Sequence, residues 1–196
     1  MRKATIERKT KETQISLKLD LDGRGDYNVK TGMPFFDHML CLMCRHGLMD
    51  LTLRAKGDVE VDYHHTVEDT GIALGQAVKK ALGEMKAIKR YGFASVPMDE
   101  SLAQVSLDIS GRPYLVYKVT FPPRGKVKDF DAALVEDFFL ALAANAGVTL
   151  HIHVPYGRNL HHMIEAVFKA FGRALMDAAT IEPRAKKEPP STKGRI

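Results

Sequence analysis

Cysteine is scarce in this chain, and long apolar runs are missing. Two cysteines, Cys41 and Cys44, occur in 196 residues, so a second pair that could complete a four-cysteine zinc site is lacking. We expect both to be small core or surface residues. No apolar run approaches the roughly 18 residues of a membrane span. The first residues lack the apolar segment of a secretion signal, and we therefore expect a cytoplasmic protein without a membrane partner.

The composition is otherwise that of a globular protein. Hydrophobic residues make up 45% and charged residues 27%, and the length suffices for one domain or two fused half-domains. A net charge of +5 is compatible with nucleic acid or an anionic small molecule as a partner. Much of the positive charge lies in a C-terminal tail that is interrupted by prolines. Its basic residues are Arg184, Lys186, Lys187, Lys193 and Arg195.

A rare pattern, His-His-x-x-Glu, occurs twice. Its members are His64, His65 and Glu68 in the first copy and His161, His162 and Glu165 in the second. Four of the eight histidines belong to these copies. If each copy starts a helix, steps of three and four residues place the carboxylate beside the imidazoles on one face. Such a face is typical of metal ligands, and it appears twice.

The similarity between the two halves extends beyond this motif. Placing Asp137 under His38 aligns the halves without a gap for over a dozen residues, and residues 51–53 fall on 150–152. An Ala/Gly-rich apolar segment follows each motif. The pattern predicts duplication of a small domain rather than a solenoid. Asp69 follows Glu68 but has no counterpart in the second copy, so the three recurring side chains are the predicted ligands.

Alternating polarity and turn residues predict an α+β protein. Strands are expected at 13–21, 29–31, 48–55, 101–109, 114–121 and 149–154, and helices at 35–46, 64–86, 135–145 and 161–179. We expect two similar halves, each a sheet with its helices on one face. The halves would span residues 1–90 and 91–182, and the basic tail residues 183–196.

The candidate ligands combine five imidazoles with three carboxylates. They are His38, His64, His65, Glu68, Asp137, His161, His162 and Glu165. Nitrogen mixed with hard oxygen suits manganese, iron or zinc better than copper(I) or calcium. Adjacent histidines lie about 100° apart on a helix and are therefore expected to serve different metals. Up to two metals follow, shared between halves or subunits. The metalloprotease pattern His-Glu-x-x-His is not present.

A second group of side chains suits a phosphate. Recognition of phosphate needs arginine, lysine and hydroxyl donors that converge. The candidates are Arg90, Arg112, Ser191, Thr192 and Lys193. Asp99, at the 97–100 junction, is a candidate for capping or orienting a ligand.

Short segments along nearly the whole chain resemble the imidazoleglycerol-phosphate dehydratase family of histidine biosynthesis. They include residues 31–40, 62–70, 96–100, 110–113, 149–152, 157–166 and 190–194. The length matches the monofunctional form. The resemblance implies removal of water from imidazole glycerol phosphate, two Mn²⁺ ions per active site, and a homo-oligomer of 24 subunits with sites at the interfaces. It also implies a duplicated half-domain like domain 2 of ribosomal protein S5, and no nucleic-acid partner.

The resemblance also assigns roles to single residues. It makes seven of the candidates metal ligands: His38, His64, His65, Glu68, His161, His162 and Glu165. Arg90, Arg112, Ser191 and Lys193 become the phosphate-binding group, which brings the tail to the substrate, and Glu12 becomes a substrate-contacting acid. Two positions depart from the family. Asp137 stands where many members have His, although an acid is still a plausible ligand, and Leu42 stands where many have Gln.

A mechanism follows as a hypothesis. The departing proton sits on a carbon beside the imidazole, so the ring must take up the electrons, and metals on its nitrogens would stabilise that charge. Glu12 is the predicted proton carrier, with Glu68 and Glu165 as further catalytic carboxylates. Two alternatives remain at this point. A binuclear hydrolase of a phosphoester could use the same ligands, and a basic nucleic-acid-binding protein would explain the tail.

Overall fold

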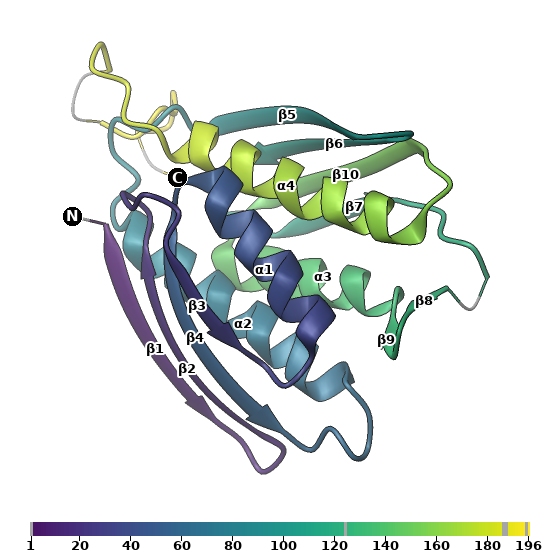
Figure 1. Cartoon of the computed structure of the whole chain (residues 1–196). Coiled ribbons are helices and arrows are strands. Elements are labelled where there is room, and N and C mark those ends of the chain that lie inside the picture. The colour runs from purple at the N-terminus through teal and green to yellow at the C-terminus, as the bar shows by residue number, and fades with distance from the viewer. Residues whose placement is uncertain (1, 124, 186–187, 195) are drawn as a thin grey trace.

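Two four-stranded sheets enclose a layer of four helices in the computed structural model (Figure 1). The structure describes residues 2–123, 125–185, 188–194 and 196. Three basic residues of the predicted tail, Lys186, Lys187 and Arg195, lie outside the described residues. No helix in the described ranges is both long and apolar enough to cross a membrane.

The elements of the two halves follow one another in the chain. The first half holds β1 (Lys3–Lys9), β2 (Thr13–Asp20), β3 (Tyr27–Lys30), α1 (Pro34–Gly47), β4 (Asp50–Gly57) and α2 (His64–Leu82). The second holds β5 (Tyr91–Met98), β6 (Ser101–Asp108), β7 (Tyr114–Lys118), the short β8 (Lys126–Val127) and β9 (Phe130–Asp131), α3 (Leu134–Ala146), β10 (Thr149–Tyr156) and α4 (Leu160–Ala179).

The two sheets have the same strand order and the same directions. The first runs β1-β2-β4-β3 and the second β5-β6-β10-β7, each with one parallel pair at the last edge. Leu53 pairs with Leu17 and Val29 on its two sides, as Ile152 pairs with Val105 and Tyr117. The expected duplication, with helices on one face of each sheet, is confirmed.

Period-two patterning explains why one face of each sheet is covered. In β2, Ile15, Leu17 and Leu19 are at most 2% exposed, while the alternate side chains are more accessible. A strand turns successive side chains to opposite faces, so these three point into the helical layer.

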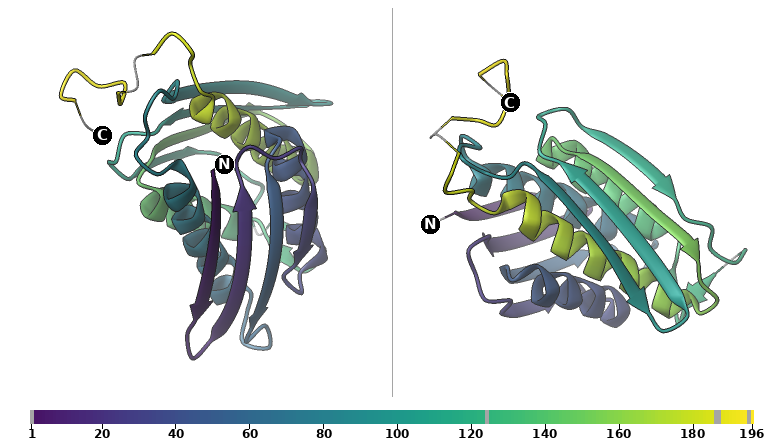
Figure 2. Two further views of the ribbon diagram at one scale, coloured as in Figure 1. Left: turned by 90° about the vertical axis from the view of Figure 1, so that its left-hand side faces the viewer. Right: turned by 90° about the horizontal axis from the view of Figure 1, so that it is seen from above.

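The helices of the two halves pack crosswise. Helix α1 lies against α4 and α2 lies against α3, so each close helix pair joins the two repeats (Figure 2). Phenylalanines from three of these helices fill the centre: Phe36 of α1 meets Phe138 of α3 edge-on at 5.4 Å, and Phe138 stacks on Phe168 of α4 at 5.4 Å. The two repeats therefore share one hydrophobic core.

Three sequence predictions need correction. Strands β1 and β5 were not expected, because β1 buries only Ala4 and β5 places small residues such as Gly92 against α4. Helix α2 ends at Leu82 instead of residue 86, since Gly83 follows with a φ of 56°. The strand expected at 114–121 ends at Lys118.

Replacing Gly75 with alanine is expected to destabilise the fold. An added Cβ at Gly75 would lie 2.5 Å from the Leu142 carbonyl oxygen on α3, which is backbone and has little room to move. We expect a loss of about 1–3 kcal/mol in unfolding free energy, measured by denaturant titration. Lys79→Ala on the exposed face of α2 is the control and should change little. Unchanged stability of Gly75→Ala would contradict this close helix contact.

Candidate metal centre

Both His-His-x-x-Glu motifs lie at the start of a helix, as predicted. Asn159 caps α4 by accepting hydrogen bonds from the backbone N–H groups of His161 and His162, at 2.9 and 3.5 Å. At the start of α2, Asp62 accepts from the His64 N–H at 2.8 Å. These polar residues fix where each helix begins, and so fix the direction of the imidazoles.

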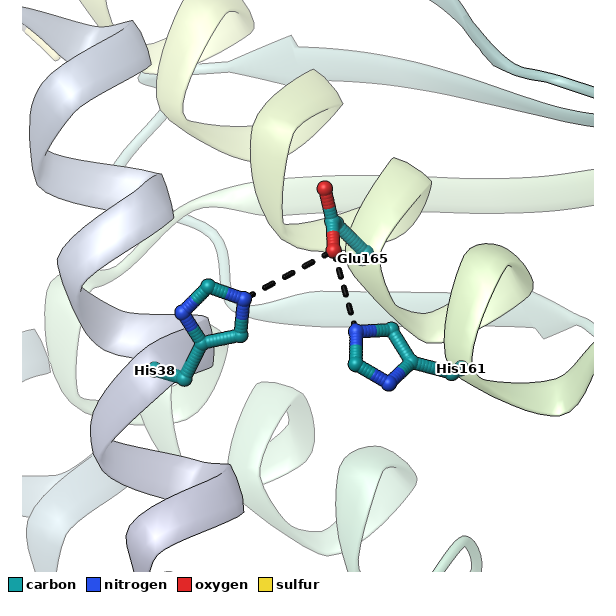
Figure 3. Close-up of side chains that lie close together, drawn as sticks. All are labelled: His38, His161 and Glu165. Atoms are coloured by element: carbon teal, nitrogen blue, oxygen red, sulfur yellow. Dashed lines mark hydrogen bonds and ion pairs between the residues drawn. The ribbon is translucent and has the colours of Figure 1, made fainter.

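Three predicted ligands converge on one point (Figure 3). The Nε2 atoms of His38 and His161 lie 3.7 and 3.1 Å from the same carboxylate oxygen of Glu165. One atom from each residue lies within 4.8 Å of the others. Two imidazole nitrogens and one carboxylate oxygen form a donor set that fits Mn²⁺, Fe²⁺ or Zn²⁺. Among the residues that the structure describes, no other three histidine, cysteine or acidic side chains converge in this way.

Glu165 is buried and ionised. Burial raises the pKa of its carboxyl group, but the contacts with Lys169 and His161 outweigh that effect, and its pKa lies below the ordinary value. The Lys169 Nζ atom is 2.5 Å from Glu165 Oε1. Sequence reasoning did not single out Lys169. Its position four residues after Glu165 on a helix was a signal that could have found it.

The second group, His64, Glu68 and Asp137, is arranged differently. His64 Nδ1 lies 3.3 Å from Asp137, whereas its Nε2 lies 3.7 Å from Glu68. The two acids therefore approach opposite edges of one ring and do not converge on a common point. This is the half-site at which aspartate replaces the histidine expected from the family.

The upstream partner of each motif comes from the other repeat. His38 of the first repeat approaches the second motif, and Asp137 of the second repeat approaches the first. The crosswise packing of α1 on α4 and α3 on α2 is the reason. Sequence order alone placed His38 before His64 and Asp137 before His161, and gave no sign of this exchange.

The second histidine of each motif points elsewhere. His65 Nδ1 lies 3.1 Å from Asp58, and His162 Nδ1 lies 2.8 Å from Glu100. The hydrogen bond to Asp58 raises the pKa of His65, and the hydrogen bond to Glu100 raises that of His162. The neighbouring rings of each pair are about 6 Å apart by centroid, at 6.1 and 6.3 Å. This divergence agrees with the expectation that adjacent histidines serve different metals.

Asp58 and Glu100 were missed by the sequence reasoning. Asp99 had been the candidate for orienting a ligand, but its carboxylate is 76% exposed and 3.9 Å from His162 Nδ1. Glu100, the next residue, makes the short contact. A turn with two adjacent acids was the signal, and only the register of the β5–β6 hairpin decides which of them faces the helix.

Glu12 lies at the turn between β1 and β2, near the first motif. Its carboxylate is 54% exposed and 4.0 Å from His65 Nδ1. Asp69 of α2 connects the two strands that flank this turn. Its buried carboxylate accepts a hydrogen bond from the Thr13 hydroxyl and pairs with Arg8 at 2.8 Å. Asp69, which the repeat comparison had set apart from the ligands, thus anchors the start of β2, directly after Glu12.

The residues predicted to bind phosphate lie together at another place in the fold. Arg90 and Arg112 both contact Asp108, at 2.7 and 3.5 Å, and Arg90 also donates to the Pro190 carbonyl at 2.9 Å. That bond brings the tail segment with Ser191 and Lys193 beside Arg90. The Lys193 N–H donates to the Ser191 hydroxyl at 3.2 Å.

These phosphate-binding candidates lie far from the three converging ligand candidates of the same chain. The Arg90 N–H donates to the carbonyl of Ala178 at the end of α4, whereas His161 stands at its start. At 1.5 Å per helical residue, the two points are roughly 25 Å apart. One chain therefore does not bring its phosphate candidates to its converging metal ligands.

Three further positions that the sequence analysis considered lie on α1. Leu42, which stands where many family members have Gln, packs against the core. Cys41 and Cys44 are free thiols on α1, and burial raises the pKa of both, most strongly for Cys44. The expectation that the cysteines are small core or surface residues is confirmed.

The contact between His162 and Glu100 predicts a pH-dependent stability of the metal-free protein. The stability that comes from protonated His162 is fully present below pH 6.5, the ordinary histidine pKa, and is lost as pH rises through the higher pKa of the folded state. The stability that comes from ionised Glu100 is fully present above pH 4.5, the ordinary glutamate pKa, and is lost as pH falls through the lower pKa of the folded state. The difference in unfolding temperature between the unchanged protein and His162→Gln should therefore be larger at about pH 5.5 than at about pH 8.5. Equal differences at both pH values would contradict it.

Comparison with known proteins gives a consistent result. A family model described as imidazoleglycerol-phosphate dehydratase matches residues 31–175. A protein of that name from Geobacter metallireducens is 57% identical over 195 residues, covering 100% of this chain and 99% of the relative. One from Nitrobacter hamburgensis is 58% identical over 196 residues, with 100% and 99% covered.

Solved structures agree in fold. The imidazoleglycerol-phosphate dehydratase of Staphylococcus aureus has a TM-score of 0.83 and 41% identity, covering 91% of this chain and 99% of its own. IGPD from Pyrococcus furiosus in complex with (S)-C348 has the same TM-score, with 34% identity and coverages of 97% and 100%.

Proposed function

The chain belongs to the imidazoleglycerol-phosphate dehydratase family, and from this premise we propose that it works with two metal ions at sites shared between subunits. Membership establishes the activity itself. The chain is a lyase of histidine biosynthesis that removes water from imidazole glycerol phosphate to give imidazole acetol phosphate. The phosphoester hydrolase and the nucleic-acid-binding protein are not favoured, because full-length relatives are dehydratases.

The metals are proposed to be two Mn²⁺ ions per active site. Supporting this, the convergent nitrogen and oxygen atoms of His38, His161 and Glu165 suit a divalent ion of that kind. The remaining ligands of the set are His64, His65, Glu68, Asp137 and His162. When bound, the ions supply stabilisation of the negative charge that develops on the imidazole ring.

Glu12 is proposed to move the proton. Its carboxylate is half exposed and stands beside the first motif, so it can reach a substrate held there. The proton leaves the carbon next to the imidazole, and its electron pair passes into the ring. Loss of the neighbouring hydroxyl as water then gives the enol, which becomes the ketone product.

The phosphate is proposed to serve as a handle. Arg90, Arg112, Ser191 and Lys193 would hold it, and its binding energy would fix the position of the reacting carbons. Asp108 holds the Arg90 guanidinium closely, at 2.7 Å, and so sets it in place before substrate arrives, while the exposed Arg112 makes a looser contact at 3.5 Å.

The active site is proposed to lie between subunits of a large homo-oligomer, with 24 subunits as in the family. The separation of roughly 25 Å along α4 supports this, because a small substrate cannot reach both groups within one chain. A second copy would bring its phosphate-binding residues to the metal ligands of the first. The cytoplasm, where small phosphorylated metabolites are interconverted, is the proposed location.

Removing the metal should abolish turnover. We expect protein stripped with a chelator to form no product and Mn²⁺ to restore the reaction, measured as the enol or ketone signal from imidazole glycerol phosphate. A metal analysis of the loaded protein should find two ions per site. Full activity without metal would contradict the proposal.

Two inactive variants should restore one another if the site is shared. Arg90→Ala loses the phosphate contact and His161→Ala loses a metal ligand, so each alone should be inactive. In mixed oligomers a site can combine the intact half of each, and about a quarter of the sites should recover at equal mixing. Activity no greater than that of the separate variants would show that one chain builds the whole site.

Glu12→Gln should separate chemistry from metal binding. The amide keeps the size of the side chain but cannot carry the proton, so we expect kcat to fall by about 10²–10⁴. Manganese affinity, measured by calorimetry, should remain unchanged. Glu7→Gln, on the exposed face of β1, is the matched control for a lost surface charge. A Glu12→Gln enzyme with normal kcat would rule out this role.

A further inference from the structure

Glu12 and Glu100 occupy the same place in the two repeats. Leu17 and Leu19 of β2 pair with Leu53 and Leu51 of β4, and Val105 and Leu107 of β6 pair with Ile152 and Leu150 of β10. The offset that carries Leu17 onto Val105 and Leu19 onto Leu107 also carries Glu12 onto Glu100. Each acid directly precedes the second strand of its sheet, at the turn of the first hairpin.

The two equivalent acids are used differently. Glu100 is 24% exposed, and one of its carboxylate oxygens accepts the backbone N–H groups of Arg158 and Asn159 at 3.1 and 2.7 Å. Its other oxygen lies 2.8 Å from His162 Nδ1. Glu12 is 54% exposed, and its carboxylate is 4.0 Å from His65 Nδ1, beyond hydrogen-bond length.

A difference between two connections accounts for this. The link from β10 to α4 is residues 157–159, and it offers no acid, so Glu100 both caps the link and holds the ring. The link from β4 to α2 is longer, residues 58–63, and it supplies Asp58. Asp58 contacts His65 Nδ1 through both carboxylate oxygens, at 3.1 and 3.2 Å.

We infer that the two hairpin acids have diverged in role: Glu100 is a positioning residue that holds His162 by Nδ1, while Asp58 holds His65 and thereby leaves Glu12 free to react. The inference rests on the proposed metal ligation by His65 and His162. It extends the proposal by naming Asp58 and Glu100, neither of which was among the predicted site residues.

The geometry of His162 has a defined chemical consequence. The Glu100 carboxylate can only accept a hydrogen bond. His162 Nδ1 must therefore carry the proton and donate it, which leaves the lone pair of the neutral ring on Nε2. The Asn159 amide nitrogen, a donor, lies 3.5 Å from Nε2, which agrees with a lone pair there. Acids that hold a ligating histidine in this way are worth about 10–100-fold in metal affinity.

Glu100→Gln is the sharpest test. Its amide oxygen can still accept from the backbone of the 157–159 link, but its NH₂ group is a donor and favours the opposite ring tautomer. We expect about 10–100-fold weaker binding of one of the two Mn²⁺ ions by calorimetry. In ¹⁵N spectra of the metal-free protein, the His162 proton should move from Nδ1 to Nε2. Asp58→Asn should act likewise on His65.

Two controls complete the design. Glu12→Gln should keep both manganese affinities and both tautomers, and Glu7→Gln should keep these and the activity. If Glu100→Gln binds both ions normally and its His162 tautomer is unchanged, the inference is wrong while the proposed function stands. If the unchanged protein takes up no manganese, the metal proposal and this inference both fail. A thermal melt of each variant establishes that the fold is intact.

Discussion

The crosswise packing of the helices is the constraint on which the rest of the structure depends. Glycines let α2 approach the backbone of α3 and α4 approach that of α1, so the helix pairs that touch belong to different repeats. The same contacts carry His38 to Glu165 and Asp137 to His64. Neither group of candidate ligands therefore forms within one repeat, and one set of contacts builds both the hydrophobic core and the geometry of these groups.

Duplication has left two half-sites that are similar in outline and different in detail. One converges on Glu165, with two imidazoles and a buried, ionised carboxylate beside Lys169. In the other, Asp137 and Glu68 approach opposite edges of His64. The hairpin acids differ in the same way, with Glu100 bound to its histidine and Glu12 exposed. In the proposed dehydration some groups hold the reactants and one group moves a proton, and unequal halves suit that division of roles.

Much of the fold could be predicted from the sequence, because local pattern determines it. The alternation of Ile15, Leu17 and Leu19 gives β2, and the repeated His-His-x-x-Glu gives two helix starts and six of the candidate ligands. Strand β1 escaped prediction since its outer positions are charged and it buries little. The sequence predicts the candidate ligands, but not Asp58 and Glu100, the acids that contact two of them.

The sequence by itself determined the duplication, most of the helices and strands, and the identity of the candidate ligands, since these depend on periodicity and spacing within short segments. The tertiary structure decided which ligands meet. The crossing of α1 with α4, the register that turns Glu100 rather than Asp99 toward His162, and the length of α4 between His161 and Arg90 all arise from contacts between distant segments. Such contacts depend on close packing of the whole core, which no short stretch of sequence encodes.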